Sequence, residues 1–209
     1  SRLSSIQADK IISFILKTAL ENKLGIAVAV ADDHGELLAF SRNKRLELKI
    51  SEVRFDEILE EIIEENRFNT DFNKIRLEVH NNVRSVFFSD VFRLKLILKN
   101  IIGNAINYHN LQKPQPFIKI TIDENETSDL LIKIEDNGMG IDNEHQEKIF
   151  QMFYRGTDRK KGTGLGLYMV KDAVEKLKGN IWMESVYGVG TTFFVSLPKI
   201  FAPETATNE

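Results

Sequence analysis

The feature that most constrains the fold is a set of segments in which apolar and polar residues alternate. The clearest are "FIKITIDEN" at 117–125, "DLLIKIED" at 129–136 and "NIWMESVYGVGTTFFVSLP" at 180–198. A period of two places the apolar side chains on one face of a strand, and that face has to be buried. The first two segments therefore predict one antiparallel hairpin, and the third predicts another that turns at residues 188–190.

Helical spacing of apolar residues elsewhere supplies elements that can cover the sheet. We expect helices over residues 56–66, from Ser89 or Asp90 to about Tyr108, over 142–153 and over 165–178. Further short strands are expected at 46–55, 75–80 and 85–89. Together these predict an α/β (α+β) two-layer sandwich, in which a mixed sheet of about five strands is covered on one face by about three helices.

The first 45 residues form a separate predicted piece. Residues 4–23 have a helical pattern, and residues 26–30 and 36–40 read as two strands around a polar turn. We therefore predict an N-terminal helix-hairpin appendage at 1–45, a main domain at 46–200 and a tail at 201–209. The appendage is open to two interpretations, a truncated or joined sensor segment and a plain helix-hairpin that packs on the sandwich.

Composition excludes several kinds of chemistry. The 209 residues include no cysteine, which excludes disulfides, thiolate metal sites and cysteine nucleophiles. The 28 basic and 31 acidic residues are interspersed and give a net charge of −3, which gives no reason to expect nucleic acid or an anionic membrane as partner. No apolar run is long enough to span a bilayer. The expectation is a soluble, cytoplasmic chain without membrane contact.

The stretch "KKGTGLGLYMV" at 160–170 places its glycines directly before a predicted helix. Glycine lets the backbone approach a ligand closely, and a helix start presents unpaired N–H groups to an anion. Neither the Walker loop nor the Rossmann fingerprint matches this spacing. The stretch predicts a phosphate site of another kind, with a flexible loop before a helix as the alternative.

A second glycine motif, "DNGMGI" at 136–141, follows the alternating strand that ends at Glu135. A carboxylate in an apolar pocket can accept the exocyclic amine of adenine and would repel the carbonyl oxygen of guanine. The alternative is an ordinary Asp-Asn-Gly hairpin turn. No strand-like run follows Ile141, which weakens that alternative.

The long predicted helix carries polar residues on one face. Arg93, Asn100, Asn104 and then Asn107 or Tyr108 recur at helical intervals among apolar neighbours. Asparagine oxygens can complete the octahedral shell of Mg²⁺ when the phosphates of ATP supply its charged ligands. The alternative is that these amides simply face solvent.

Five ordered motifs carry a resemblance to a known family. "LKNIIGNAINYH", "DNGMGI", "FQMFYRG", "GTGLGL" and "GVGTTF" resemble the N, G1, F, G2 and G3 boxes of the histidine-kinase catalytic and ATP-binding domain, within the wider gyrase-like ATPase superfamily. The resemblance covers about residues 46–198. It implies ATP held between the long helix and a lid at about 150–164, which lies between the second and third covering helices.

The resemblance also implies residue roles. Asp136 would bind adenine, Asn104 would hold Mg²⁺, and Asn100 and Tyr108 would face the phosphates. Thr192 would lie near the base. The nucleotide-binding residues that it implies are Asn100, Asn104, Asn107, Tyr108, Asp136, Gly138, Gly140, Ile141, Phe153, Arg155, Gly162, Thr163, Gly164, Leu165, Gly166 and Thr192.

The chain departs from the family pattern at two positions of the long helix. Asn107 stands where members usually carry Lys, and a basic residue of the lid (Arg155, Arg159, Lys160 or Lys161) is the expected substitute. Relatives that hydrolyse ATP with water carry Glu at the position of Asn100. A neutral amide accepts no proton at pH 7, so slow hydrolysis is expected.

The implied function is the Mg-ATP-binding catalytic domain of a two-component sensor histidine kinase, a protein-histidine phosphotransferase. None of the four histidines has the context of a phosphoacceptor, so we expect that histidine outside this chain, on a helix-hairpin partner that would in turn serve a response regulator. The alternative is a non-catalytic ATP-binding module.

The N-terminal piece is less distinctive. It resembles the opening of haem-degrading-type sensor domains and, nearly as well, that of PAS domains. Its apolar stripe of Ile11, Ile15 and Leu16 leaves a homodimer seam open, although ordinary core is the favoured interpretation.

Overall fold

The computed structural model describes residues 48–110, 112–125, 129–155 and 164–200, together with the backbone of two strands near the N-terminus. The chain divides into two compact units, Ser1–Leu48 and Lys49–Glu209. In the first unit β1 (Ala27–Ala31) pairs antiparallel with β2 (Leu37–Arg42), which confirms the predicted N-terminal hairpin. The helix predicted at 4–23 and the tail at 201–209 lie outside the described residues.

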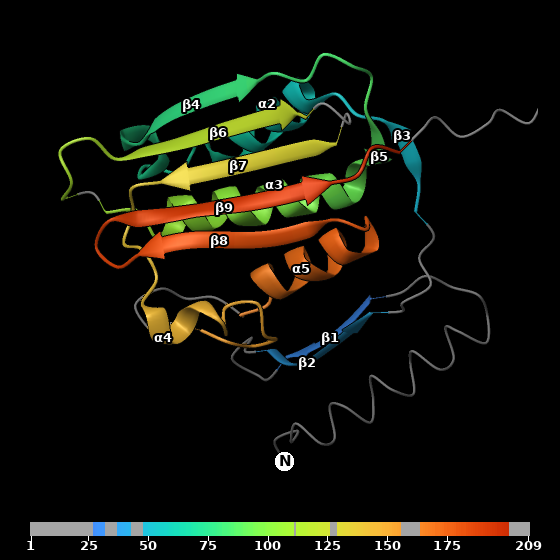
Figure 1. Ribbon diagram of the computed structural model, residues 1–209. Helices are drawn as coiled ribbons and strands as arrows, with labels where there is room; N and C mark the ends of the chain where they lie inside the picture. Colours follow the sequence, from blue (N-terminus) through green and yellow to red (C-terminus); the bar gives the residue numbers. More distant parts are fainter. Residues whose placement is uncertain are drawn as a thin grey trace, which may run out of the picture. The chain divides into compact units, whose positions relative to one another are not determined.

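The second unit is built on a five-stranded sheet with the order β4-β6-β7-β9-β8 (Figure 1). The pairing of β4 with β6 is parallel and the other pairings are antiparallel, so the sheet is mixed, as expected. Both hairpins that the alternation predicts are confirmed. The strands are β4 (Arg76–Asn81), β6 (Phe117–Glu124), β7 (Leu130–Asp136), β8 (Asn180–Val186) and β9 (Gly190–Leu197), and the short strands β3 (Ile50–Glu52) and β5 (Phe88–Asp90) form a separate pair.

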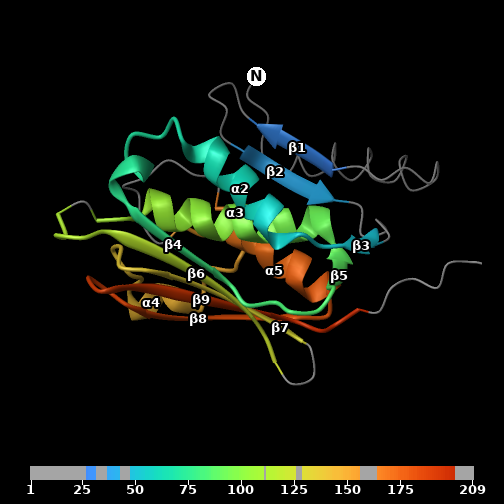
Figure 2. The same ribbon diagram turned by 90° about the horizontal axis from the view of Figure 1, so that it is seen from above.

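Three helices cover one face of this sheet: α2 (Phe55–Asn66), α3 (Val91–Asn107) and α5 (Gly166–Lys176) (Figures 1 and 2). The arrangement confirms the predicted two-layer sandwich. A short helix, α4 (Asn143–Gln146), lies at one end of the sheet, and a single 3-10 turn spans Phe72–Lys74. Of the helices in the described residues, none combines the length and the apolar character needed to cross a membrane.

The core forms where the alternating strands meet the helices. On β6 and β7 every second side chain is fully buried, including Ile120 and Ile132. Leu98 and Ile101 of α3 are buried to the same extent on the helical side. The opposite face of the sheet is open to solvent, and there the rings of Trp182 and Phe194 stack at 5.1 Å. One-sided burial of this kind is what a period of two requires.

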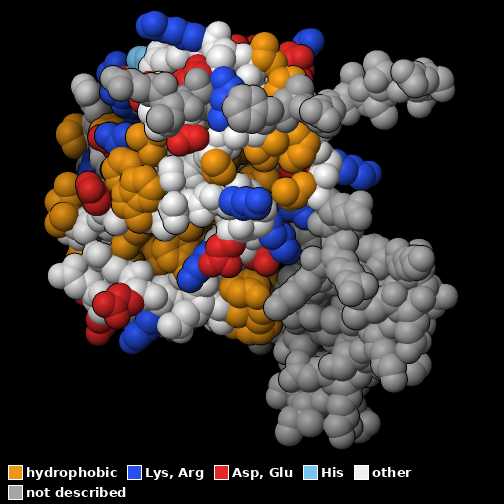
Figure 3. Space-filling model, turned by 45° about the vertical axis from the view of Figure 1, so that its right-hand side comes forward, with side chains coloured by type: hydrophobic (Ala, Val, Ile, Leu, Met, Phe, Trp, Pro, Cys, Tyr) orange, Lys and Arg blue, Asp and Glu red, His pale blue; other side chains and the backbone are white. Residues whose placement is uncertain are grey.

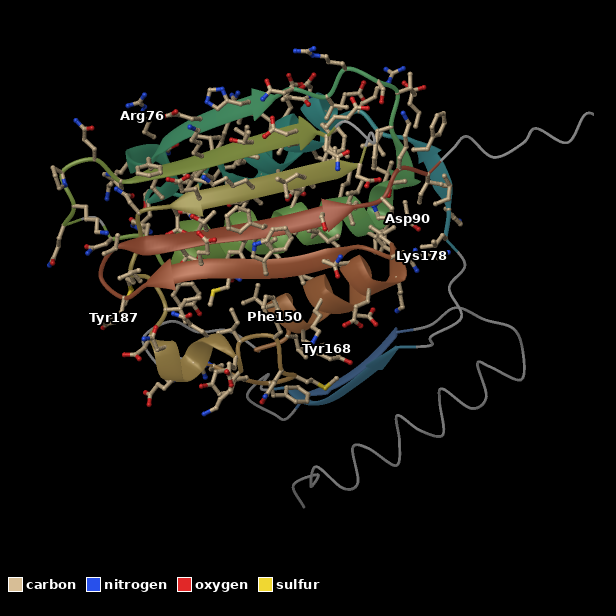
Figure 4. The ribbon with its side chains drawn as sticks, viewed as in Figure 1. Arg76, Asp90, Phe150, Tyr168, Lys178 and Tyr187 are labelled. Atoms are coloured by element: carbon tan, nitrogen blue, oxygen red, sulfur yellow. The ribbon has the colours of Figure 1, made fainter. Side chains whose placement is uncertain are left out.

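A buried ion pair fixes the start of α3. The Asp90 carboxylate accepts a hydrogen bond from the Arg93 backbone N–H at 2.9 Å and pairs with the Arg93 guanidinium. It also accepts the backbone N–H of Lys49 at 3.0 Å, which ties the beginning of the second unit to this helix. Asp90 is thus confirmed as the helix cap, and Figure 4 shows it at the end of the sheet away from Tyr187. Arg93, grouped in the sequence with the asparagines of α3, belongs to this network.

Two predicted elements are shorter than expected. Within the described part of the strand predicted at 46–55, only β3 forms, because the Phe55 ring turns inward to lie 6.0 Å from that of Phe87, centroid to centroid, and Phe55 begins α2. The helix predicted at 142–153 ends at Gln146 and continues as separate turns. There Ile149 is buried and its N–H still donates to the His145 carbonyl at 3.1 Å, while the Phe150 ring packs edge-on against Phe193 with 6.4 Å between ring centroids.

Charges of both signs are intermixed on the surface. Figure 3 shows basic and acidic side chains side by side on the face that it draws. Several are paired, as in the contact of Lys99 with Glu65 between α3 and α2 and that of Lys176 with Asp172 at 2.6 Å within α5. Exposed pairs of this kind contribute little stability each. Because charges of both signs are intermixed there, that face has no large patch of a single charge sign.

The alternation along β7 gives the first testable prediction. Ile132→Ala removes a fully buried side chain and should lower the free energy of unfolding by about 2–5 kcal/mol, because it leaves a cavity. Leu131→Ala on the same strand is the matched control. Leu131 faces the open side, opposite Ser196, so this change should cost less than about 1 kcal/mol. Urea unfolding followed by the fluorescence of Trp182 measures both, and equal losses would contradict the assigned faces.

Candidate functional site

Three segments that are far apart in the sequence gather at one end of the sheet. They are the carboxyl end of β7, the C-terminus of α3 and the turn between β8 and β9 (Figure 1). Backbone hydrogen bonds join these segments: the Tyr108 carbonyl accepts from the Met139 N–H at 2.9 Å, and the Met139 carbonyl accepts from the Gly188 N–H at 2.7 Å. The start of α5 lies against the middle of α3, where a Cβ on Gly166 would be 2.8 Å from the Asn100 Oδ1. The sequence motifs singled out above are thus brought together in space.

Asp136 is the last residue of β7 and shares the helix-covered face with Ile132 and Ile134. Its Oδ1 accepts a hydrogen bond from the Gly138 backbone N–H at 2.8 Å. We call residues 136–141 the adenine loop, after the ligand group expected there. The loop lies tightly against α3, because a Cβ added at Gly138 would come within 2.6 Å of the Tyr108 carbonyl oxygen.

The environment of Asp136 changes its acidity. Burial raises the pKa of Asp136 to about 6, and the negative charge of Glu135 acts in the same direction. Backbone hydrogen bonds from Gly138 and Thr191 and the positive charge of Lys113 lower it again, without offsetting the effect of burial. At neutral pH the side chain is therefore an ionised acceptor in a poorly solvated position.

The adenine loop is fixed on its other side by the β8–β9 hairpin. Gly140 has a positive φ of 69°, and a Cβ there would lie 2.1 Å from the Val186 carbonyl oxygen, so only glycine fits. The Ser185 hydroxyl accepts the Ile141 N–H at 2.8 Å and donates to the Gly190 carbonyl at 3.0 Å. Ser185 was not identified from the sequence, since a serine in an alternating strand carries no special signal.

The threonine beside Asp136 in the structure is a different one from that expected from the sequence. Thr191 lies directly opposite Asp136 in the β7–β9 pairing and is buried. Thr192, the residue that the sequence suggested, pairs instead with Glu135 and Glu184. Since side chains alternate along β9, Thr192 lies on the solvent-facing side of the sheet. Thr191 therefore replaces Thr192 as the candidate beside the base.

One amide of α3, that of Asn100, lies against the start of α5. The Asn100 Nδ2 donates to the Leu96 carbonyl at 2.8 Å, and its Oδ1 lies 2.8 Å from the position that a Cβ on Gly166 would take. Within the described part of the chain, the Asn104 side chain has no hydrogen-bond partner. Asn107 is exposed, one turn further along.

α5 begins without a side-chain cap, since its N-cap residue Leu165 makes no such hydrogen bond. Among the described residues no side chain caps the first N–H groups of this helix, which lie close to Asn100. Leu165 itself is buried, which anchors the helix start in the core.

The lid is described only at its two ends. The Phe153 N–H donates to the Gly164 carbonyl at 3.1 Å, and both residues have positive φ, 63° and 67°. Arg155 is exposed at the last described position before the gap. Gly162, Thr163 and the basic residues Arg159, Lys160 and Lys161 lie outside the described residues, so their predicted roles stay predictions.

Comparison with known proteins identifies the family. Residues 89–200 match the family described as histidine kinase-, DNA gyrase B- and HSP90-like ATPase. That match covers more than half of the chain and includes α3, the adenine loop and the uncapped start of α5. The chain belongs to this ATPase family.

Sensor kinases are among the proteins similar to this histidine kinase-like ATPase domain. Sensor protein SrrB of Staphylococcus aureus is 42% identical over 120 residues, which cover 56% of this chain and 20% of that protein. The solved catalytic domain of histidine kinase ThkA is 27% identical with a TM-score of 0.61, covering 72% of this chain and 98% of that one. Full-length ShkA in complex with AMPPNP has a TM-score of 0.65 at 22% identity, over 75% of this chain and 32% of that one, which shows a shared fold. This chain thus spans about a fifth of the length of SrrB.

The tight fit of the adenine loop gives a second prediction. Gly138→Ala places a methyl group against the Tyr108 carbonyl and should lower the free energy of unfolding by about 1–3 kcal/mol. Gly103→Ala, in the middle of α3, is the control. A Cβ at Gly103 meets nothing within 4 Å, and alanine should stabilise the helix there by about 0.4–1 kcal/mol. The two changes in the free energy of unfolding, measured with urea, should therefore have opposite signs. Stabilisation by both changes would show that a methyl group at position 138 is not crowded against Tyr108.

Proposed function

We propose that this domain binds Mg-ATP between α3, the adenine loop and the start of α5, and transfers the γ-phosphoryl group to a histidine of a helix-hairpin domain outside these residues. The phosphorylated histidine would then serve a response regulator. The kinase reading is favoured over other ATPases of the family because the similar proteins reported above are sensor histidine kinases.

The observation that carries this proposal is the meeting of α3 with α5. The Asn100 amide oxygen lies against Gly166, so the polar face of α3 borders the uncapped helix start. Unpaired helix N–H groups and the positive end of the helix dipole favour an anion with several oxygen atoms. A triphosphate at this position would extend from an adenine held at Asp136.

Adenine recognition would depend on Asp136 and its neighbours. The ionised carboxylate is an acceptor that fits the exocyclic amine of adenine and repels the carbonyl oxygen of guanine. Thr191, opposite Asp136, would lie at the same edge of the base, and its hydroxyl is already hydrogen-bonded to Ser185 at 2.9 Å. The glycine backbone at 138 and 140 keeps side chains away from the base.

Asn104 is the residue best suited to hold the metal. Its amide has no partner among the described residues, and amide oxygens are suitable ligands for Mg²⁺. When bound, the ion would neutralise charge on the phosphates during transfer. Among the described residues there is no cluster of His, Asp and Glu that could bind a metal ion unaided.

The transfer step needs little covalent chemistry from this domain. The acceptor imidazole nitrogen attacks the γ-phosphorus, the bond to the β,γ-bridging oxygen breaks, and ADP leaves with the electron pair. The imidazole proton goes to a base on the acceptor domain. The ATP-binding domain itself contributes the positioning of ATP and the stabilisation of charge on its phosphates. Asn100 is a neutral amide and cannot activate water, so bound ATP should survive until the acceptor arrives.

The raised pKa of Asp136 predicts pH-dependent nucleotide binding. Below pH about 6 the free carboxyl group is protonated and presents a hydroxyl donor to the adenine amine, which is also a donor. ATP affinity should therefore fall as the pH falls through about 6, by roughly tenfold between pH 7 and pH 5 beyond any change seen in Asp136→Asn. The Asp136→Asn variant has no titrating side chain at this position, while the phosphates of ATP titrate equally with either protein. It is therefore the matched control in calorimetry. Parallel pH profiles in the two proteins would remove Asp136 from the site.

The assignment of Asn104 is tested by its metal dependence. Asn104→Ala should weaken ATP binding in the presence of Mg²⁺ by about 1–3 kcal/mol and change binding in EDTA much less. Isothermal titration with and without the metal provides the comparison. An equal loss under both conditions would mean that Asn104 contacts the nucleotide or supports the fold and does not bind the metal.

The kinase function is tested by phosphoryl transfer in trans. The chain is incubated with γ-labelled ATP and the helix-hairpin domain of a related sensor kinase, and the acid-labile label on histidine is followed. Label on that domain is expected, with little phosphate release in its absence. Binding of ATP without transfer to any acceptor supplied would favour a non-catalytic nucleotide module. Rapid phosphate release without acceptor would contradict the inert role given to Asn100.

A further inference from the structure

Lys113 connects two parts of the nucleotide site that are far apart in the sequence. It lies in the segment between α3 and β6, and its Nζ donates to the Gly138 carbonyl at 3.1 Å and to the Val189 carbonyl at 2.6 Å. These acceptors are 25 and 76 residues away along the chain. One ammonium group thus joins the adenine loop to the turn between β8 and β9.

The segment that carries Lys113 is itself anchored. The Asn137 Nδ2 donates to the Gln115 carbonyl at 2.8 Å, and the Asn137 Oδ1 accepts the Phe117 N–H at 2.8 Å. The lysine side chain therefore starts from a backbone that is fixed to the adenine loop and ends on that loop and on the neighbouring turn. Hydrogen bonds from a charged donor are stronger than those between neutral groups.

We propose that Lys113 is a positioning and specificity-determining residue of the nucleotide site, which holds the adenine loop and the β8–β9 turn at a fixed separation. The proposal deepens the function proposed above and rests on it. Val189 lies two residues before Thr191, and Gly138 lies two residues after Asp136. Fixing the two carbonyls therefore fixes the two side chains that would contact the base.

The charge of Lys113 has a second effect, on the ionisation of Asp136. Among the described residues, Lys113 and Glu135 are the charged groups that act on this carboxyl, the first favouring its ionised form and the second opposing it. A protonated Asp136 would present a donor that suits the carbonyl oxygen of guanine. Loss of Lys113 should therefore weaken the preference for adenine over guanine as well as the affinity for ATP.

The experiment compares the whole chain with Lys113→Met, Lys113→Gln and Lys113→Arg. Lys95→Met is the control, since it also removes a lysine with an ionic partner, Glu61, but at the contact of α2 and α3. Carboxyl ¹³C NMR follows the titration of Asp136 in the nucleotide-free protein, and calorimetry gives the affinities for ATP and GTP at pH 7 and pH 6.

In the methionine and glutamine variants the midpoint of the Asp136 titration should rise by about half a pH unit to one unit, with a lower ATP-to-GTP affinity ratio. Lys113→Arg and Lys95→Met should keep the parental midpoint. In an Asp136→Asn background, Lys113→Met should cost less ATP affinity than in the parent.

Three results would overturn the proposal: an unchanged midpoint in both neutral variants, a shift in Lys113→Arg as large as in Lys113→Met, or an undiminished loss of ATP affinity in the Asp136→Asn background. The titration needs no nucleotide. A chain that binds no ATP would therefore contradict the proposed function, while the titration would still decide whether Lys113 acts on Asp136.

Discussion

The register between β7 and β9 is the constraint on which the rest of the site depends. It places Asp136 opposite Thr191 at the end of a row of buried side chains, where the carboxyl group is poorly solvated. The same register brings the β8–β9 turn beside the adenine loop, where Gly188 reaches Met139. A slip of one residue would turn Thr191 outward and break these contacts together, because side chains alternate between faces.

α3 joins the core of the domain to the site. Its first turns contribute fully buried side chains such as Leu94 and Leu98 to the contact with the sheet. Its last turns present Asn100 and Asn104, and the Tyr108 carbonyl at its end receives the adenine loop. Because one rigid helix does all of this, the packing of the core fixes where the polar groups stand. The buried pair of Asp90 and Arg93 sets its starting point.

Local sequence was a weaker guide where tertiary contacts compete with hydrogen bonds along the chain. The residues after Gln146 have a helical pattern, yet they form separate turns, because Ile149 and Phe150 pack beneath the end of the sheet. The strand expected at 46–55 is cut short in the same way by the burial of Phe55. In both cases an apolar side chain gains more from burial than the backbone loses at an element end.

The sequence by itself determined the sandwich, the two hairpins and the position of Asp136, because a period of two specifies which face of each strand must be buried. It also determined the ATPase motifs, which are local. Only the tertiary structure showed which threonine stands beside Asp136. In "TTFFVSL" the alternation with Phe193, Val195 and Leu197 puts Thr191 on the buried face, but only the cross-strand pairing places it opposite Asp136. It alone also revealed Lys113, whose two acceptors are distant in the chain and leave no periodic signal.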